Sequence, residues 1–373
     1  MACPIGRAGY GVGMKADVSF ARFRGLEARG VLECIDVLEH PERLREGLWF
    51  MVAEFDSSYG DGTAMAWRFA EHGPVEPTEP TEPASADWRG PSARSWRSSV
   101  SEREYVASVS EVLNMIGTGA LTQVNLCRVL AAALPADDGE PDARALADRL
   151  AAGNPAPYAG AIHVPEASGV EPVWVVSASP ELYLSLADGV LSSGPIKGTA
   201  PTADQLTEKD RTENLLVAAA VGEELAAVCV PGSVDIVDRL RVEQHPGLVH
   251  LVSTVTGRLD PELARADDLW LRILEATSAP ASVVGVPRGT AMTAIEILEP
   301  EPRGAYCGAF GWIDGDAGTA ELAAAIRTFW WDGEDEMLRF GTGAGITGES
   351  DPMREWQETE LKAKRLIALA SAQ

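Results

Sequence analysis

The alternation of apolar and polar residues predicts strands and helices in no regular order. Residues 31–35 and 49–53 are apolar runs of strand length. After Ser101, apolar residues recur every three or four positions, and Ser101 with Glu104 has the pattern of a helix capping box. Strands are clustered and helices are inserted among them without a βαβ alternation. The pattern therefore predicts an α+β fold.

The rest of the chain continues this mixture. Asp188-Gly189 predicts a hairpin turn, and a glycine-rich loop is expected at 341–348. Further strands are expected at 123–126, 174–186, 234–239, 248–256, 308–313 and 323–328, and further helices at 203–228, 260–276, 287–298 and 352–372.

A proline- and glutamate-rich repeat, Glu76–Pro83, interrupts the pattern. We expect it to be an extended surface loop rather than a partner-binding ligand. The chain then divides into a strand-rich part at 1–72, a Pro/Glu/Ser-rich loop at 73–99 and a main region at 100–373.

Composition narrows the functional classes. Lys plus Arg number 31 against 56 Asp plus Glu, so the net charge is −25, which argues against nucleic acid and anionic membrane surfaces as partners. No apolar run is long enough to span a membrane, and the first 15 residues do not resemble a secretory signal. The five cysteines are widely spaced without a C-x-x-C pair, so we expect reduced thiols and a cytoplasmic protein.

Lys197 is the first candidate for chemistry. It lies between Ile196 and Gly198, shortly after Glu181 and across a predicted hairpin from it. Burial would lower the pKa of Lys197 and make the amine a nucleophile. The alternative, a solvent-exposed lysine at a strand end, is more common for a single lysine.

Carboxylates on predicted helices form a second group. Glu213 lies in one helix, and Glu355 and Glu358 are three positions apart in the last, with Lys362 one turn later. Such carboxylates suit Mg²⁺. The alternative is a charged, exposed helix face with an i,i+4 Glu–Lys pair.

A third group consists of His250, Arg327 and residues 343–346. An Arg after the apolar run 323–326 needs an anion if it is buried, and a glycine-rich segment can offer backbone N–H groups to the same anion. His250 in an apolar strand is more often a core residue. The glycine spacing matches neither a dinucleotide fingerprint nor a P-loop.

Taken together, these segments resemble the chorismate-utilising enzymes, namely anthranilate synthase component I, aminodeoxychorismate synthase component I, and the isochorismate and salicylate synthases. The likeness covers about residues 100–370. It is carried by Gln123-Val-Asn-Leu126, Ser179-Pro-Glu181, Pro195-Ile-Lys-Gly-Thr199, Lys209-Asp-Arg-Thr-Glu-Asn-Leu215, His250-Leu-Val-Ser-Thr254, Arg303-Gly-x-Tyr-x-Gly308, Ala325-Ile-Arg-Thr328, Gly343-Ala-Gly-Ile346 and Glu355-x-x-Glu-Thr-x-x-Lys362.

The resemblance implies a large α+β sandwich of two β-sheets flanked by helices, with the active site between the sheets. Residues 100–373 would be the chorismate-binding catalytic region, and residues 1–72 would complete the sandwich.

The resemblance also implies a reaction. Aminodeoxychorismate synthases carry Lys before Gly-Thr, where the other members typically have Ala, so Lys197 points to amination of chorismate at C4. Lys197 would attack C2 while Glu181 protonates the leaving C4 hydroxyl, and ammonia would then add at C4 and expel the lysine. Gln123 replaces the water-activating Lys of isochorismate synthases, and a neutral amide cannot act as that base.

The remaining roles follow from the same likeness. His250 would lie beside C4, and Thr199 and Ser282 would line the ring-carboxylate site. Gln123 and Lys362 complete the expected substrate-binding set. The expected ligands of the enolpyruvyl carboxylate are Tyr306, Arg327, Gly343, Ala344 and Gly345, and the expected Mg²⁺ ligands are Glu213 and Glu358, with Glu355 close by.

Two segments depart from the family pattern. Residues 219–226 lack an Asp and an Arg that relatives have. Residues 279–288 differ from the pattern that relatives have there, Pro-Gly-Gly-Ser-x-Thr-Gly-Ala-Pro-Lys. Two alternatives therefore stay open: anthranilate-synthase-like amination at C2 with loss of pyruvate, and a non-catalytic paralogue that binds chorismate or a partner. No cysteine has the Gly-x-Cys-x-Gly setting of a glutaminase nucleophile, so ammonia is expected from a separate glutamine amidotransferase subunit.

Overall fold

The structure is a computed structural model that describes residues 18–55, 62–75, 88–136, 139–245 and 248–372. The Pro/Glu repeat at 76–83 lies outside the described residues, and the three-part division of the chain stays a prediction. Among the described residues, no helix is long and apolar enough to cross a membrane.

Eighteen strands of the described residues form one hydrogen-bonded sheet. All pairings are antiparallel, and one run of neighbours connects the two ends of the sheet. The order is β6 (Gln123–Ala133), β18 (Met337–Thr347), β17 (Thr328–Asp332), β8 (Val173–Ser179), β7 (Tyr158–Val164), β1 (Phe20–Phe23), β2 (Leu26–Asp36), β4 (Ala64–Pro74), β3 (Leu48–Ala53), β15 (Ala309–Asp314), β16 (Thr319–Ala324), β9 (Leu182–Ala187), β10 (Val190–Gly194) and β13 (Leu248–Arg258).

Short strands extend both ends of this run. β5 (Arg97–Ser98) and β14 (Gly285–Val286) pair with β6. β11 (Ile196–Ala200) continues β10 along one side of β13, and β12 (Asp235–His245) pairs with its other side.

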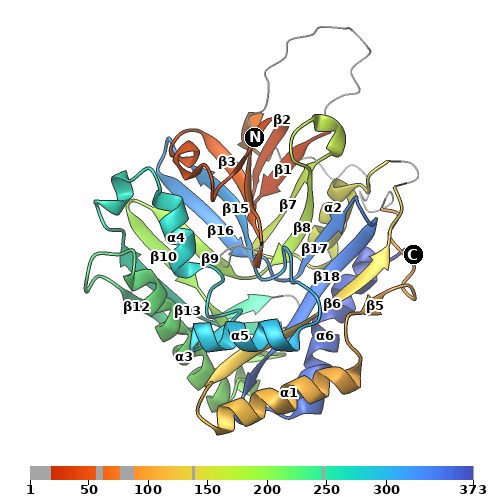
Figure 1. Cartoon of the computed structure of the whole chain (residues 1–373), viewed down its shortest axis with the longest axis vertical. Helices are drawn as coiled ribbons and strands as arrows, with labels where there is room; N and C mark the ends of the chain where they lie inside the picture. The colour runs from red at the N-terminus through yellow and green to blue at the C-terminus, as the bar shows by residue number, and fades with distance from the viewer. Residues whose placement is uncertain (1–17, 56–61, 76–87, 137–138, 246–247, 373) are drawn as a thin grey trace, which may run out of the picture.

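The two ends of the sheet face each other. Lys197 lies on β11 at one end and Asn125 on β6 at the other, yet the Lys197 Nζ is 2.8 Å from the Asn125 Oδ1. Strong twist makes a sheet of this size curl, so that β6 and β18 lie opposite the β10–β13 region (Figure 1). The predicted α+β fold is confirmed, and the two layers belong to one continuous sheet.

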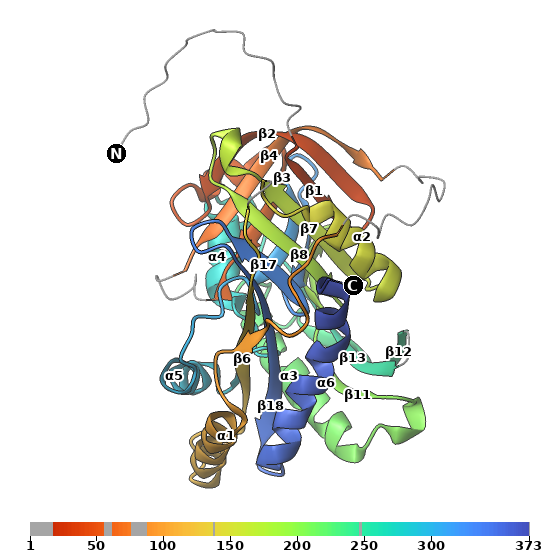
Figure 2. The same ribbon diagram turned by 90° about the vertical axis from the view of Figure 1, so that its right-hand side faces the viewer.

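Helices cover the outer faces of these layers (Figures 1 and 2). α1 (Glu102–Gly117) packs on α6 (Pro352–Ala370), which lies along β18, and α3 (Glu208–Ala226) covers β11 and β13. α2 (Ala143–Gly153) covers β7 and β8, α4 (Leu269–Thr277) packs on α3, and α5 (Arg288–Leu298) lies against β6. The predicted capping box is confirmed, because the Ser101 hydroxyl accepts from the Glu104 N–H at the start of α1.

Several predicted elements were wrong in part. The strand expected at 323–328 is divided between β16, which ends at Ala324, and β17, which begins at Thr328, and the helix expected at 203–228 begins at Glu208. The helix expected at 260–276 begins only at Leu269, because the Asp260 carboxylate accepts the N–H groups of Glu262 and Leu263 and forms a turn. The loop expected at 341–348 is instead the end of strand β18, paired with β6 as far as Thr347. Glycines alternate there with larger residues, which is the strand period of two.

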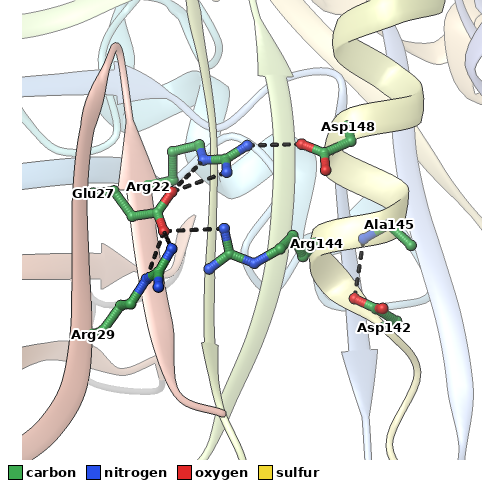
Figure 3. A network of polar contacts seen from close by, with 7 residues as sticks. All are labelled: Arg22, Glu27, Arg29, Asp142, Arg144, Ala145 and Asp148. Carbon is green, nitrogen blue, oxygen red and sulfur yellow. Dashed lines mark hydrogen bonds and ion pairs between the residues drawn. The ribbon is translucent and has the colours of Figure 1, made fainter. Parts of the chain in front are cut away.

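An ion-pair network attaches the first hairpin to the rest of the molecule (Figure 3). Glu27 on β2 accepts hydrogen bonds from Arg22, Arg29 and Arg144. Arg22 also binds Asp148 on α2, at 2.7 Å. Because β1 pairs with β7 on the other side, the N-terminal strands share both the sheet and this network with the later part of the chain.

Candidate active site

Lys197 projects into the space between the facing ends of the sheet. Its Nζ donates to the Asn125 Oδ1 at 2.8 Å. Burial lowers the pKa of Lys197, and the charge of Lys362 lowers it further, while Glu181, Glu213 and Glu358 oppose the change. The amine is therefore neutral at a lower pH than an ordinary lysine, which favours nucleophilic chemistry.

Gly345 on β18 leaves the room that this arrangement needs. A Cβ there would lie 3.1 Å from the Gln123 Nε2, 3.1 Å from the Asn125 Oδ1 and 3.3 Å from the Lys197 Nζ. Gln123 is fully buried, and neither of its amide atoms has a hydrogen-bond partner among the described residues. A buried amide of this kind requires a ligand or an ordered water.

Glu181 is the buried acid of the site. The Ser282 hydroxyl donates to its Oε1 at 2.6 Å. Burial raises the pKa of Glu181 to about 7, although the Ser282 hydrogen bond and the charge of Lys197 oppose this effect. Near neutral pH Glu181 can therefore deliver a proton, and the Ser282 hydroxyl is engaged with this acid.

His250 connects Thr199 to Arg327. The Thr199 Oγ1 is 2.8 Å from its Nδ1, and the Arg327 Nη2 is 3.2 Å from its Nε2. A guanidinium can only donate, so Nε2 must accept and Nδ1 carries the proton. Burial, with the charges of Arg327 and His245, lowers the pKa of His250 to about 3. The imidazole is neutral, with its tautomer determined by these contacts.

Arg327 directly precedes β17, and Tyr306 packs on the face of β18. Arg327 adopts a left-handed backbone conformation, with φ of 54°, immediately before β17. Burial lowers its pKa, so this guanidinium favours an anionic partner. The ring of Tyr306 packs on Gly341, where a Cβ would meet the Tyr306 Cγ at 2.0 Å.

The backbone of β18 offers N–H groups beside Arg327. The N–H of Asn125 and that of Cys127 bond to groups away from β18. In an antiparallel ladder their partners, Gly345 and Gly343, then also point their N–H groups away from β6. β17 pairs with β18 only as far as Phe340. The N–H groups of Gly343 and Gly345 therefore point outward from a part of β18 that, in the described part of the chain, has no neighbouring strand on that side. Ala344 lies between them with its side chain buried.

The candidate metal ligands come from two helices. Glu213 on α3 is 3.5 Å from Lys209, and its Oε1 is buried without a hydrogen-bond partner among the described residues. Glu358 on α6 pairs with Lys362 at 2.7 Å, and the charge of Lys362 lowers the pKa of Glu358. Glu355 is buried, which raises its pKa.

This set of carboxylates suits Mg²⁺, which needs few protein ligands, better than it suits a metal whose ligands all come from the protein. In the part of the chain that the structure describes, no three Asp, Glu, His or Cys side chains gather closely enough to bind a metal. Mg²⁺ typically uses one or two carboxylates and completes its shell with water and substrate oxygens. The Lys362 Nζ also donates to the Gly343 carbonyl at 3.0 Å, so this group adjoins the β18 edge.

The sequence indicated no role for Asn125 or Asn214, although both lie in the motifs shared with the family. Asn125 contacts Lys197, and the Asn214 Nδ2 donates to the Leu251 carbonyl at 2.8 Å and to the Lys197 carbonyl at 3.3 Å. Both side chains are buried. The only signal in the sequence was the position of Asn125 within an apolar strand, because Asn214 follows a polar stretch of its helix.

Comparison with known proteins identifies the family. The profile described as chorismate binding enzyme matches residues 38–368. The chain belongs to this family. The aminodeoxychorismate synthase component 1 of Klebsiella aerogenes is 32% identical over 324 residues, which cover 83% of this chain and 65% of that protein. The anthranilate synthase component 1 of Saccharolobus solfataricus is 35% identical over 280 residues, covering 72% and 62%.

This member of the chorismate binding family spans slightly less than two thirds of the length of those two relatives. Solved structures share its fold over nearly the whole chain. Anthranilate synthase component I from Streptococcus pneumoniae has a TM-score of 0.75 at 19% identity and covers 97% of this chain and 95% of its own. The menaquinone-specific isochorismate synthase of Escherichia coli has a TM-score of 0.73 at 20% identity, covering 96% and 90%.

The two segments that depart from the family pattern contact each other. The Glu224 carboxylate on α3 accepts from the Ala281 N–H at 3.0 Å. Burial raises the pKa of Glu224 to about 8, although the charge of Arg288 opposes this. Both changes therefore lie in one contact between α3 and the segment that carries Ser282.

Proposed function

We propose that this protein is a cytoplasmic enzyme that aminates chorismate at C4 to 4-amino-4-deoxychorismate, towards 4-aminobenzoate. Ammonia would come from a separate glutamine amidotransferase subunit. The observation that carries the proposal is the Lys197 amine, which has a lowered pKa and interacts electrostatically with the buried acid Glu181. A buried amine with a lowered pKa and a buried acid with a raised pKa suit displacement of a poor leaving group.

Lys197 would begin the reaction. Its neutral amine attacks C2, the ring double bond shifts, and the C4–O bond breaks. The leaving hydroxide takes the proton of Glu181 and departs as water. Ammonia then forms the C4–N bond while the C2–N bond breaks and returns Lys197 as a neutral amine. A proton from the new C4 ammonium restores Glu181.

The remaining groups would bind and orient the substrate. Arg327 and the N–H groups of Gly343 and Gly345 would bind the enolpyruvyl carboxylate, with Tyr306 packed beside them. Neutral His250, held by Thr199, would lie near C4 without adding charge. Glu213 and Glu358, with Glu355 nearby, would hold Mg²⁺, which would offset the charge of the ring carboxylate when bound.

The first test is an incubation with chorismate, Mg²⁺ and ammonium, followed by chromatography and mass spectrometry. We expect a product in which amine replaces hydroxyl and the enolpyruvyl group is kept, and an added lyase should convert it to 4-aminobenzoate. Lys197→Ala should lose at least about 100-fold in rate, because the covalent route disappears. Lys364→Ala, a change of an exposed lysine on α6, should retain full activity.

A second reading is amination at C2 with release of pyruvate. It is favoured by the similarity to an anthranilate synthase component 1, at 35% identity. Anthranilate and pyruvate as the main products, with Lys197→Ala still active, would establish this reading. Unchanged chorismate in a folded sample that binds it would instead favour a non-catalytic paralogue.

A further inference from the structure

Asn125 lies between the two groups assigned above to nucleophilic and acid chemistry. We propose that Asn125 is a positioning residue that holds the Lys197 amine and links it, through Ser282, to Glu181. The inference rests on the proposed function, because it concerns the nucleophile and the acid of that reaction.

The orientation of the Asn125 amide is determined by its neighbours. Its Nδ2 donates to the Ser282 carbonyl at 3.1 Å, and its Oδ1 accepts from the Lys197 Nζ at 2.8 Å. A carbonyl can only accept, so the nitrogen must be the end that faces Ser282. The oxygen is therefore the end that faces the amine.

The backbone of Asn125 is held on both sides. Its N–H donates to the Val284 carbonyl at 2.7 Å, and its carbonyl accepts from the Arg303 Nη2 at 2.8 Å. The residue is 8% exposed, and Arg303 is itself buried and paired with Glu299. The acceptor that faces Lys197 is thus a fixed point rather than a mobile side chain.

A fixed neutral acceptor suits a lysine nucleophile for two reasons. Lysine has a long, flexible stem with high rotamer entropy, so an anchor is needed to aim its amine. When one N–H is donated to Oδ1, the lone pair of the neutral amine must point elsewhere, away from the anchor. A carboxylate in the same place would instead favour the ammonium form.

Asn125 and Ser282 together connect the nucleophile to the acid. The Ser282 carbonyl accepts from Asn125, and the Ser282 hydroxyl donates to Glu181 at 2.6 Å. The chain from Lys197 through Asn125 and Ser282 to Glu181 therefore joins three segments that are far apart in sequence. Its role is to keep the nucleophile and the proton donor at a set separation across the substrate.

The test compares Asn125→Ala and Asn125→Asp with wild type, with Asn154→Asp at the end of α2 as the matched charge control. Steady-state kinetics give kcat and the KM for chorismate. Carbamoylation by cyanate, followed by peptide mass spectrometry, reports the reactivity of the Lys197 amine without turnover. The charged groups that face this amine, Glu181 from the β8–β9 connection, Glu213 from α3 and both Glu358 and Lys362 from α6, are the same in every variant.

Asn125→Ala should lower kcat by about 10- to 100-fold with little change in KM, because a misplaced nucleophile slows the reaction after binding. Its Lys197 should still react with cyanate. Asn125→Asp should slow both amination and carbamoylation of Lys197 at pH 7 by more than about tenfold, with recovery as the pH rises, because the carboxylate favours the ammonium form. Asn154→Asp should behave as wild type in both assays.

Two results would overturn the inference: a wild-type kcat in Asn125→Ala, or a wild-type pH profile of carbamoylation in Asn125→Asp. Failure of the proposed function is separate from these, because it would show as anthranilate and pyruvate in place of a C4-aminated product from the wild-type protein. If Asn125→Ala does not fold, the near-isosteric Asn125→Asp still decides the question through carbamoylation.

Discussion

Glu181 and Lys197 show how burial prepares a pair of residues for opposite roles. Burial raises the pKa of Glu181 to about 7 and lowers that of Lys197, so each group moves towards its neutral form. The acid therefore keeps its proton to a higher pH than usual, and the amine loses its proton at a lower pH than usual. Such pairs are expected where one residue gives a proton and another attacks.

Glu181→Gln should separate activity from stability. The amide cannot give a proton, so the rate should fall by about 10²- to 10⁴-fold. The folded-state pKa of about 7 lies above the ordinary 4.5, so wild-type stability falls as pH rises between these values. At pH 8 the variant should therefore be more stable, by on the order of 3 kcal/mol. Urea unfolding at pH 5 and pH 8, with product assays, measures both effects.

Ser282→Ala is the companion variant. It removes the hydrogen bond that lowers the pKa of Glu181 but leaves the acid in place. The alkaline limb of kcat/KM should therefore move to higher pH. If the alkaline limb does not move and the KM for chorismate rises, the Ser282 hydroxyl instead binds the substrate carboxylate.

At the scale of elements, strand β18 shows how function shapes secondary structure. Its glycines suggested a loop, but Gly341 makes room for Tyr306 and Gly345 for Lys197, Gln123 and Asn125. The pairing with β6 along the whole strand supplies the backbone order that glycine lacks by itself.

The β1–β2 hairpin and α2 carry a second element-scale prediction. Burial would raise the pKa of Glu27, but hydrogen bonds from Arg29 and Arg22 and the charge of Arg144 hold it below 4.5. Its contribution to stability is thus complete above pH 4.5 and is lost as the pH falls through the folded-state value. Glu27→Gln should cost about 1 kcal/mol at neutral pH.

Hydrogen exchange at pH 7 would locate this loss in β1, β2 and α2, and unfolding at acid pH should no longer separate the variant from wild type. Glu71→Gln, a change of an exposed glutamate on neighbouring β4, is the control and should have no effect. An equal loss in both variants would show that Glu27 acts only through general surface charge.

At the scale of the whole molecule, the curl of the sheet creates the site. α3 covers β11 and β13 at one end, and α6 covers β18 at the other. Glu213 and Glu358 both affect the pKa of Lys197 from these two helices. A cation held by both carboxylates would therefore connect the two ends of the sheet across the substrate.

Thermal unfolding can test this connection without turnover. Mg²⁺ and chorismate together should raise the melting temperature by more than the sum of their separate effects, because each completes the binding site of the other. Glu213→Gln and Glu358→Gln should abolish this excess. Glu301→Gln, a change of an exposed glutamate, is the control and should keep it. The metal assignment would be wrong if all three variants responded as wild type does.

The sequence by itself determined the mixed α and β content, the capping box at Ser101, the hairpin at Asp188-Gly189, and the residue types that define the family. These features depend on near neighbours and on periodicity, which are readable along the chain. Only the tertiary structure decided that Asn125 contacts Lys197, 72 positions away, and that Glu181 and Lys197 are displaced towards neutrality. Protonation and positioning depend on burial and on contacts between distant strands, and the folded sheet alone brings these together.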